Sequence, residues 1–244
     1  RIWWEEEGEG PPIVLLHGYT SNLRTHWRAS GWFEHLAANH RVIALDQRGH
    51  GRSEKPRQRD SYSRSLMAAD VAAVLDAAGV ERATLFGYSM GAIVGTQTLL
   101  DYPDRFDGAI LGGMGVQWEV DGRRQCPDEE HPGAPRPHRD LQRSASAVTS
   151  WLRHYNPFAM RALAQGVFFG QEPMPAARLS EIGVPVLSVS GTRDRFCAGT
   201  KLLPSAITNC RRIVLTGQTH ISAVSDPRFK AAVSEFLAEL HPDA

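Results

Sequence analysis

The stretch that decides the fold is ATLFGYSMGAIVG, residues 83–95. ATLF predicts a short strand, and the small residues after the motif predict a helix that runs to about Tyr102. Ser89 lies at the junction, between Gly87 and Gly91, which is the strand–turn–helix context of a nucleophile elbow. At such an elbow the serine hydroxyl projects above the sheet, and a Cβ at either flanking glycine would collide with a neighbouring element. We therefore expect Ser89 to be a nucleophile.

The same residues have a second interpretation, because short glycine patterns often occur by chance. A glycine-rich turn could place a serine before a helix purely as a cap. The strand–turn–helix order, together with Gly95, which lets the helix pack close to the sheet, favours the catalytic interpretation of Ser89.

Outward from this stretch, strand-like runs alternate with helical runs. Helices are predicted near residues 32–38, along an apolar stripe at 67–78, and after Asp226, which would cap a helix that starts at Pro227. Such alternation predicts an α/β fold, with a mostly parallel twisted sheet covered by helices on both faces. The other predicted strands are IWWEE from Ile2, IVLL from Ile13 (joined to the first across GEGPP), VIALD from Val42, AILG from Ala109, VPVLSVSG from Val184 and RRIVLT from Arg211.

One segment, residues 114–180, interrupts this alternation. It divides the chain into a core, residues 1–113 and 181–244, and an insertion with two predicted helices, one around 141–152 and one that starts at Asn156. We expect a small helical cap over the site; the alternative is an inert decoration. Several aromatic side chains of the insertion are expected to line an apolar substrate pocket, although each could instead pack the cap on the sheet: Trp118, Trp151, Phe158 and Phe168.

A serine hydroxyl is a weak nucleophile and needs a base, which in turn needs an orienting group. His220 follows the strand RRIVLT, and Asp194 follows the strand VPVLSVSG in GTRD. Both are therefore predicted at the carboxyl edge of the sheet, where Ser89 also lies and where ligands bind in such sheets. Taken separately, His220 could be a surface histidine and Asp194 an Asx-turn residue. Their order after Ser89 favours a catalytic triad.

The strand IVLL runs into HGYT, residues 17–20. We expect the backbone N–H of Tyr19 to pair with that of Met90 as an oxyanion hole. His17 is expected to brace this loop through hydrogen bonds and not to exchange protons.

The stretch DQRGHGRS, residues 46–53, predicts a tight turn held by an ion pair or by side-chain to backbone bonds. It lacks the G-K-[ST] ending of a phosphate loop, so we assign it a structural role.

Composition excludes several classes of partner. Lys plus Arg and Asp plus Glu both count 27, so no net charge favours nucleic acid or an acidic membrane surface. The mean hydropathy is −0.32, and no apolar run approaches the ~20 residues of a membrane span. We expect a small-molecule substrate; the sequence does not indicate an oligomeric state.

The beginning of the chain has no signal-peptide pattern, and three cysteines far apart in sequence mildly favour a reducing compartment. We therefore expect a cytoplasmic protein, with a disulfide as the alternative. The chain does not begin with Met, so a native N-terminal segment is expected to precede Arg1.

The motifs HGYT, DQRGHGRS, GYSMG and GTRD, followed by a late histidine after a strand, resemble the α/β-hydrolase superfamily, and its small esterase-like members most. The resemblance spans nearly the whole chain and is weakest in the insertion. It implies the α/β-hydrolase fold and acyl transfer to Ser89 and then to water, without metal or organic cofactor. It also implies eight strands, so one strand is expected before the seven found here. Gln218-Thr219 depart from the two small residues usual before the late histidine.

Hydrolysis of a carboxylic ester with an apolar part is the first expectation. The same triad supports lactone, amide or carbon–carbon cleavage and cofactor-free perhydrolysis, and a slow-turnover ligand receptor could keep this scaffold. Relatives that open epoxides or break carbon–halogen bonds carry Asp at the elbow, and Ser89 argues against both.

Overall fold

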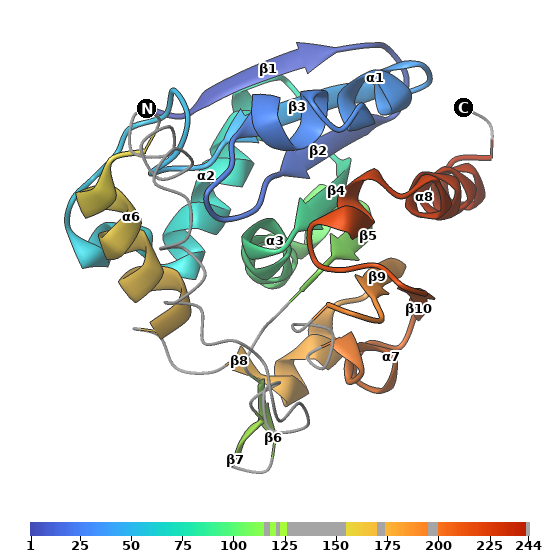
Figure 1. The fold of residues 1–244 in the computed structure, drawn as a ribbon. Coiled ribbons are helices and arrows are strands. Elements are labelled where there is room, and N and C mark those ends of the chain that lie inside the picture. Colours follow the sequence, from blue (N-terminus) through green and yellow to red (C-terminus); the bar gives the residue numbers. More distant parts are fainter. Residues whose placement is uncertain (115–117, 121–122, 126–154, 170–173, 195–199, 243–244) are drawn as a thin grey trace.

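All seven predicted strands lie in one sheet, in the order β1-β3-β2-β4-β5-β9-β10 (Figure 1). This computed structural model describes residues 1–114, 118–120, 123–125, 155–169, 174–194 and 200–242. Every neighbouring pair is parallel except β1 with β3. The predicted fold class is therefore confirmed. The strands are β1 (Trp3–Glu7), β2 (Pro12–Leu16), β3 (Arg41–Asp46), β4 (Ala83–Tyr88), β5 (Phe106–Gly112), β9 (Val186–Gly191) and β10 (Cys210–Leu215).

Strand β1 lies at one edge of the sheet, and it pairs with β3 although β2 follows it along the chain. Strand β2 has no room for it, because β3 and β4 occupy both sides of β2. The glutamates of β1 are paired with arginines: Glu5 lies 3.0 Å from Arg24 and Glu6 lies 2.7 Å from Arg41. A charged edge of this kind resists pairing with another chain.

Helices cover both faces of the sheet, as predicted (Figure 1). Helices α2 (Arg64–Ala77) and α3 (Met90–Asp101) pack on one face, and α1 (Trp32–Ala37) and α8 (Pro227–Leu240) pack on the other. Asp226 caps α8 by accepting from Arg228 N, and Ser63 caps α2. Shorter segments are the π-helical turns Arg24–Arg28 and Gln165–Phe169, the 3-10 turns Arg59–Tyr62, Pro103–Arg105, Ala176–Glu181 and Ser222–Ser225, and α7 (Leu203–Ala206).

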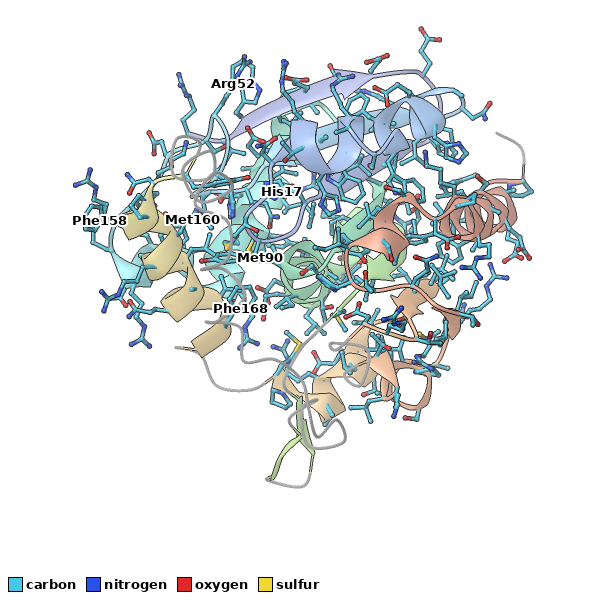
Figure 2. All side chains as sticks on the ribbon, in the orientation of Figure 1. His17, Arg52, Met90, Phe158, Met160 and Phe168 are labelled. Carbon is cyan, nitrogen blue, oxygen red and sulfur yellow. The ribbon has the colours of Figure 1, made fainter. Side chains whose placement is uncertain are left out.

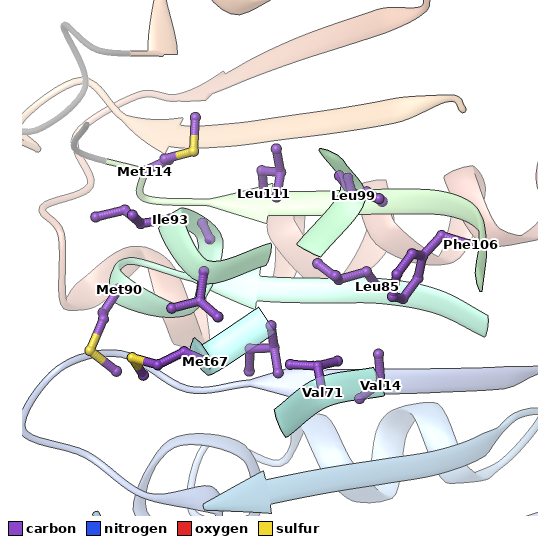
Figure 3. Close-up of a cluster of buried hydrophobic side chains, with 14 of the residues drawn as sticks. Val14, Met67, Val71, Leu85, Met90, Ile93, Leu99, Phe106, Leu111 and Met114 are labelled. Atoms are coloured by element: carbon purple, nitrogen blue, oxygen red, sulfur yellow. The ribbon is translucent and has the colours of Figure 1, made fainter. Parts of the chain in front are cut away.

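The hydrophobic core has two layers, one on each side of the sheet. Along β2, Val14 and Leu16 pack toward α2 and α3, whereas Ile13 and Leu15 pack toward α1 and α8. This alternation is the two-residue period of a strand that is buried on both faces. Figure 3 shows the first layer, in which Met90, the first residue of α3, packs near Met67 of α2. Because Met90 directly follows Ser89, this layer fixes the start of the helix beside the candidate nucleophile.

The insertion contains more than the predicted helices. The helix expected to start at Asn156 is α6 (Pro157–Ala164), and Asn156 is its N-cap. A small sheet of β6 (Trp118–Val120), β7 (Arg123–Gln125) and β8 (Met174–Pro175) was not predicted, because strands of two or three residues show no periodicity. The helix predicted around 141–152 lies outside the described residues, and the division at 114 and 180 stays a prediction.

Within the described part of the chain, no helix is both long enough and apolar enough to cross a bilayer.

Candidate active site

Ser89 sits on a strained turn between β4 and α3. Its backbone has φ 55° and ψ −118°, in the region that residues with a side chain rarely adopt. The flanking glycines make the turn fit: a Cβ at Gly87 would collide with the carbonyl of Gly91, and a Cβ at Gly91 would collide with the carbonyl of Leu16. The elbow therefore depends on close approach of backbone to backbone, as the sequence predicted.

This packing gives a test of the elbow that does not depend on activity. In Gly91→Ala the new methyl group meets backbone that cannot move aside, so we expect the free energy of unfolding to fall by about 1–3 kcal/mol or more. For a chain of this size that corresponds to a fall in Tm of about 2–4 °C per kcal/mol. The matched control is Gly183→Ala, because a Cβ at Gly183 would have no neighbouring atom within 4 Å. Equal melting temperatures for the two variants would contradict the close approach at Gly91.

The structure brings the three predicted residues into one hydrogen-bonded row. Ser89 Oγ lies 2.9 Å from His220 Nε2, and His220 Nδ1 lies 2.9 Å from Asp194 Oδ2. Asp194 is buried, with 2% of its surface exposed, and follows β9, whereas His220 follows the neighbouring parallel strand β10. Because a carboxylate only accepts, Nδ1 of His220 donates to Asp194, which leaves Nε2 free to accept the hydroxyl proton of Ser89.

The loop before His220 is held in place despite the departure at Gln218-Thr219. Arg193 N donates to the carbonyl of Gln218 over 2.9 Å, and a Cβ at Gly191 would collide with that same carbonyl. The hydroxyl of Tyr88 donates to the carbonyl of His220 over 2.6 Å. Sequence reasoning missed Tyr88, although it directly precedes Ser89; its side chain links the strand of the nucleophile to the loop of the base.

His17 braces the loop after β2, as expected. Its Nδ1 lies 2.8 Å from the carbonyl of Gly18, and its Nε2 accepts from Gln47 N over 3.0 Å. Since Nε2 accepts, Nδ1 must be the protonated nitrogen that donates to Gly18. Burial lowers the pKa of His17, so the ring stays neutral and both bonds persist.

The geometry of this loop bears on the proposed oxyanion donors Tyr19 and Met90. Gly18 passes beside the nucleophile: a Cβ there would lie 3.3 Å from Ser89 Cβ. Its carbonyl, bound by His17, belongs to the same planar peptide as the N–H of Tyr19, so holding one fixes the other. Met90 is the first residue of α3, where backbone N–H groups have no carbonyl within the helix to bind. The oxyanion role of both N–H groups stays a prediction.

A further histidine near the site was not singled out among the ten in the sequence. His26 is partly buried, with its ring 5.2 Å from that of Tyr88. Burial lowers its pKa to about 3, helped by repulsion from His17 and His220. The imidazole of His26 is therefore neutral at neutral pH, so it adds no fixed charge beside His220.

The turn DQRGHGRS is held by both kinds of bond that were expected. Asp46 accepts from the backbone N–H of Leu23 at 2.8 Å and of Arg52 at 2.7 Å. Arg48 forms a two-pronged ion pair with Asp70, at 2.6 and 2.7 Å. The stretch is thus a structural turn that also anchors the segment after the HGYT loop.

The predicted pocket residues have different positions. Phe168 is half-buried, and its ring lies 5.4 Å from that of Tyr19. Phe158 is 64% exposed, points away from the body of the protein in Figure 2, and lies against the guanidinium of Arg57, so the structure does not bring it to Ser89. The backbone of Trp118 lies in β6, but the positions of its side chain and of Trp151 are outside the described residues. No group of three or more metal-ligating side chains occurs among the residues described.

Comparisons with known proteins agree with this fold. The family described as alpha/beta hydrolase fold matches residues 11–131. The chain is 26% identical to a Bacillus subtilis protein named as a candidate 2-succinyl-6-hydroxy-2,4-cyclohexadiene-1-carboxylate synthase, over 95% of this chain and 93% of that one. An esterase from Rhodococcus sp. ECU1013 superposes with a TM-score of 0.76 and 27% identity, over 98% and 95% of the two chains. An N-acyl homoserine lactone degrading enzyme gives 0.75 and 28%, over 96% of each chain. The protein is thus a member of the α/β-hydrolase superfamily.

Proposed function

We propose that this protein is a serine hydrolase that cleaves a carboxylic ester through an acyl-enzyme intermediate. The observation that carries the proposal is the continuous row from Ser89 Oγ through His220 to Asp194, with both links at 2.9 Å. A hydroxyl, an imidazole and a buried carboxylate in this order are the parts that activate a serine.

In the first half of the reaction, Ser89 Oγ attacks the ester carbonyl carbon while His220 Nε2 takes the hydroxyl proton. The buried carboxylate of Asp194 stabilises the imidazolium that forms. The negative charge that develops on the carbonyl oxygen is stabilised by the N–H groups of Tyr19 and Met90; losing one such donor costs about 2.7–4 kcal/mol of barrier. The imidazolium then gives its proton to the departing alcohol, which leaves an ester of Ser89.

In the second half, water replaces the alcohol. His220 takes a proton from the water, the resulting hydroxide attacks the acyl carbon, and the proton returns to Ser89 Oγ as the acid leaves. Every proton in this cycle passes through Nε2 of His220, so the chemistry needs neither a metal nor an organic cofactor.

The substrate is a small molecule with an apolar part. Tyr19 packs its ring on Phe168 and donates its hydroxyl to the carbonyl of Met160, and both partners belong to the insertion, which we propose is a cap over the site. Met90, the residue after Ser89, belongs to the same apolar cluster as Tyr19 and Phe168 (Figure 2). The likeness to an N-acyl homoserine lactone degrading enzyme makes a lactone, which is a cyclic ester, the second candidate. Amide or carbon–carbon cleavage and perhydrolysis would use the same three residues.

A fluorophosphonate probe tests the nucleophile. We expect one adduct per chain, at Ser89, located by intact mass and peptide mapping, because Ser89 is the serine whose hydroxyl is bound to His220 Nε2. An adduct elsewhere, or none in folded protein, would show that the serine-hydrolase proposal is wrong.

Turnover of short and long p-nitrophenyl esters and of a lactone then separates the candidates. A hydrolase of the proposed kind turns over at least one ester and loses this activity when the probe is bound. A receptor on a hydrolase scaffold would bind these compounds and would not release product at a useful rate.

A further inference from the structure

The loop that carries the proposed oxyanion donor is strained. Thr20 has φ 57°, and within the described ranges it and Ser89 are the two residues other than glycine with positive φ. Such a conformation costs about 1–3 kcal/mol and persists only where neighbouring groups hold it. Thr20 is exposed, so burial of its own side chain does not supply that hold.

Two tyrosine hydroxyls connect this loop to the insertion, in opposite directions. Tyr155, just before α6, donates to the carbonyl of Thr20 over 2.8 Å. Tyr19 donates to the carbonyl of Met160, within α6, over 2.9 Å. The ring of Tyr19 also packs on Phe168, beyond the end of α6. Burial raises the pKa of both phenols, so both hydroxyls keep the protons that they donate.

These bonds act on the backbone next to the oxyanion donor. The peptide that carries the Tyr19 N–H is held at its carbonyl end, by the bond from His17 to the Gly18 carbonyl. Toward the C-terminus, this peptide is connected to the Thr20 carbonyl through φ and ψ of Tyr19 and of Thr20. The bond from Tyr155 to that carbonyl therefore restrains the backbone that follows the Tyr19 N–H. A shift of about 1 Å in a catalytic group can cost 10²-fold in rate, so this restraint matters for turnover.

We propose that Tyr155 and Tyr19 are positioning residues. Their hydroxyls tie residues 17–20, which carry the proposed oxyanion donor, to residues 155–169 of the insertion, so that the loop holds its catalytic shape only while residues 155–169 pack against it. The inference rests on the proposed function, and it gives the insertion a part in assembling the oxyanion hole as well as in covering the substrate. The bond from Tyr155 to the Thr20 carbonyl joins residues 135 apart in sequence.

The test compares Tyr155→Phe, Tyr19→Phe and the double variant with Tyr62→Phe. Tyr62 is the matched control, because its hydroxyl also donates to a backbone carbonyl, that of Pro56, at 2.6 Å. We expect each tether variant to lower kcat about three- to tenfold for an acetate ester, with KM unchanged, as for loss of one hydrogen bond. The double variant should lower kcat by less than the product of the two single-variant factors, because both bonds hold one loop.

Two readouts distinguish positioning from general destabilisation. The Ki of a trifluoromethyl ketone, which forms an oxyanion on Ser89, should rise in proportion to the loss in kcat/KM. Hydrogen exchange of peptides that contain residues 17–20 should be faster in the tether variants than in wild type. Tyr62→Phe also loses one hydrogen bond and should lower Tm to a similar extent, but its kcat, Ki and exchange at residues 17–20 should stay at the wild-type values.

Unchanged exchange at residues 17–20 overturns the proposal, and so does faster exchange with unchanged kcat and Ki. If wild-type protein turns over no ester, the proposed function fails, and the exchange measurement alone decides whether the hydroxyls hold the loop.

Discussion

Replacing Ser89 by alanine should lower kcat by about 10⁶-fold, the scale seen when the nucleophile of a comparable triad is removed. The methyl group keeps the volume of the site but has no oxygen to attack the carbonyl, and the 2.9 Å bond to His220 Nε2 is lost. Substrate affinity should change little, because the proposed oxyanion donors Tyr19 and Met90 and the apolar side chains near them remain. The measurement is kcat on the best ester from the panel, with Kd for its unreactive ether analogue by calorimetry.

The control is Ser205→Ala, prepared in the same way, because Ser205 is an exposed serine whose hydroxyl bonds to the carbonyl of Leu202 at 2.9 Å. It should keep wild-type kcat, and the contrast with the loss in Ser89→Ala then excludes a contaminating esterase as the source of activity. Residual activity of Ser89→Ala within a hundredfold of wild type would mean that another group attacks the substrate.

Replacing Asp194 by asparagine should lower kcat by up to about 10⁴-fold with the fold intact, by analogy with the same change in a serine protease. The asparagine amide can donate to Nδ1 of His220, which would place the ring proton on Nε2. Nε2 would then face Ser89 as a donor and could not accept its proton. The measurement is kcat at neutral pH together with Tm.

Asp226→Asn is the matched control for Asp194→Asn. Asp226 is also buried and also accepts hydrogen bonds, from the backbone and side chain of Arg228, but it caps α8 and does not contact the triad. Asparagine is a good N-cap, so both stability and kcat should change little. If Asp194→Asn stayed within a few-fold of wild type, a different carboxylate would orient His220.

The strands and the meeting of Ser89, Asp194 and His220 were predictable because each depends on short-range pattern. Buried parallel strands read as apolar runs, and catalytic residues follow such strands at the carboxyl edge of the sheet. Ser89, Asp194 and His220 each follow a predicted strand closely, so the sheet alone brings them together. The antiparallel pairing of β1 with β3 was not predictable in this way, since it depends on which edge of the sheet is vacant.

Contacts between the core and the insertion were not predictable from the sequence. Phe158 and Phe168 are both aromatic residues of one helical segment, yet one lies on the surface and the other packs on Tyr19. Only the docking of α6 decides between them. In the same way, nothing local to Tyr155 indicates that its hydroxyl binds a carbonyl 135 residues earlier.

The row of hydrogen bonds at the candidate site joins parts of the chain that are synthesised far apart in time. Ser89 and His220 are separated by 131 residues, and β9 and β10 must be paired before Asp194 and His220 can meet. Non-local pairings of this kind form slowly, because the intervening chain must first lose its freedom. We therefore expect recovery of activity during refolding to mark completion of this last part of the sheet, later than burial of Trp27, whose ring packs on Phe86 of β4.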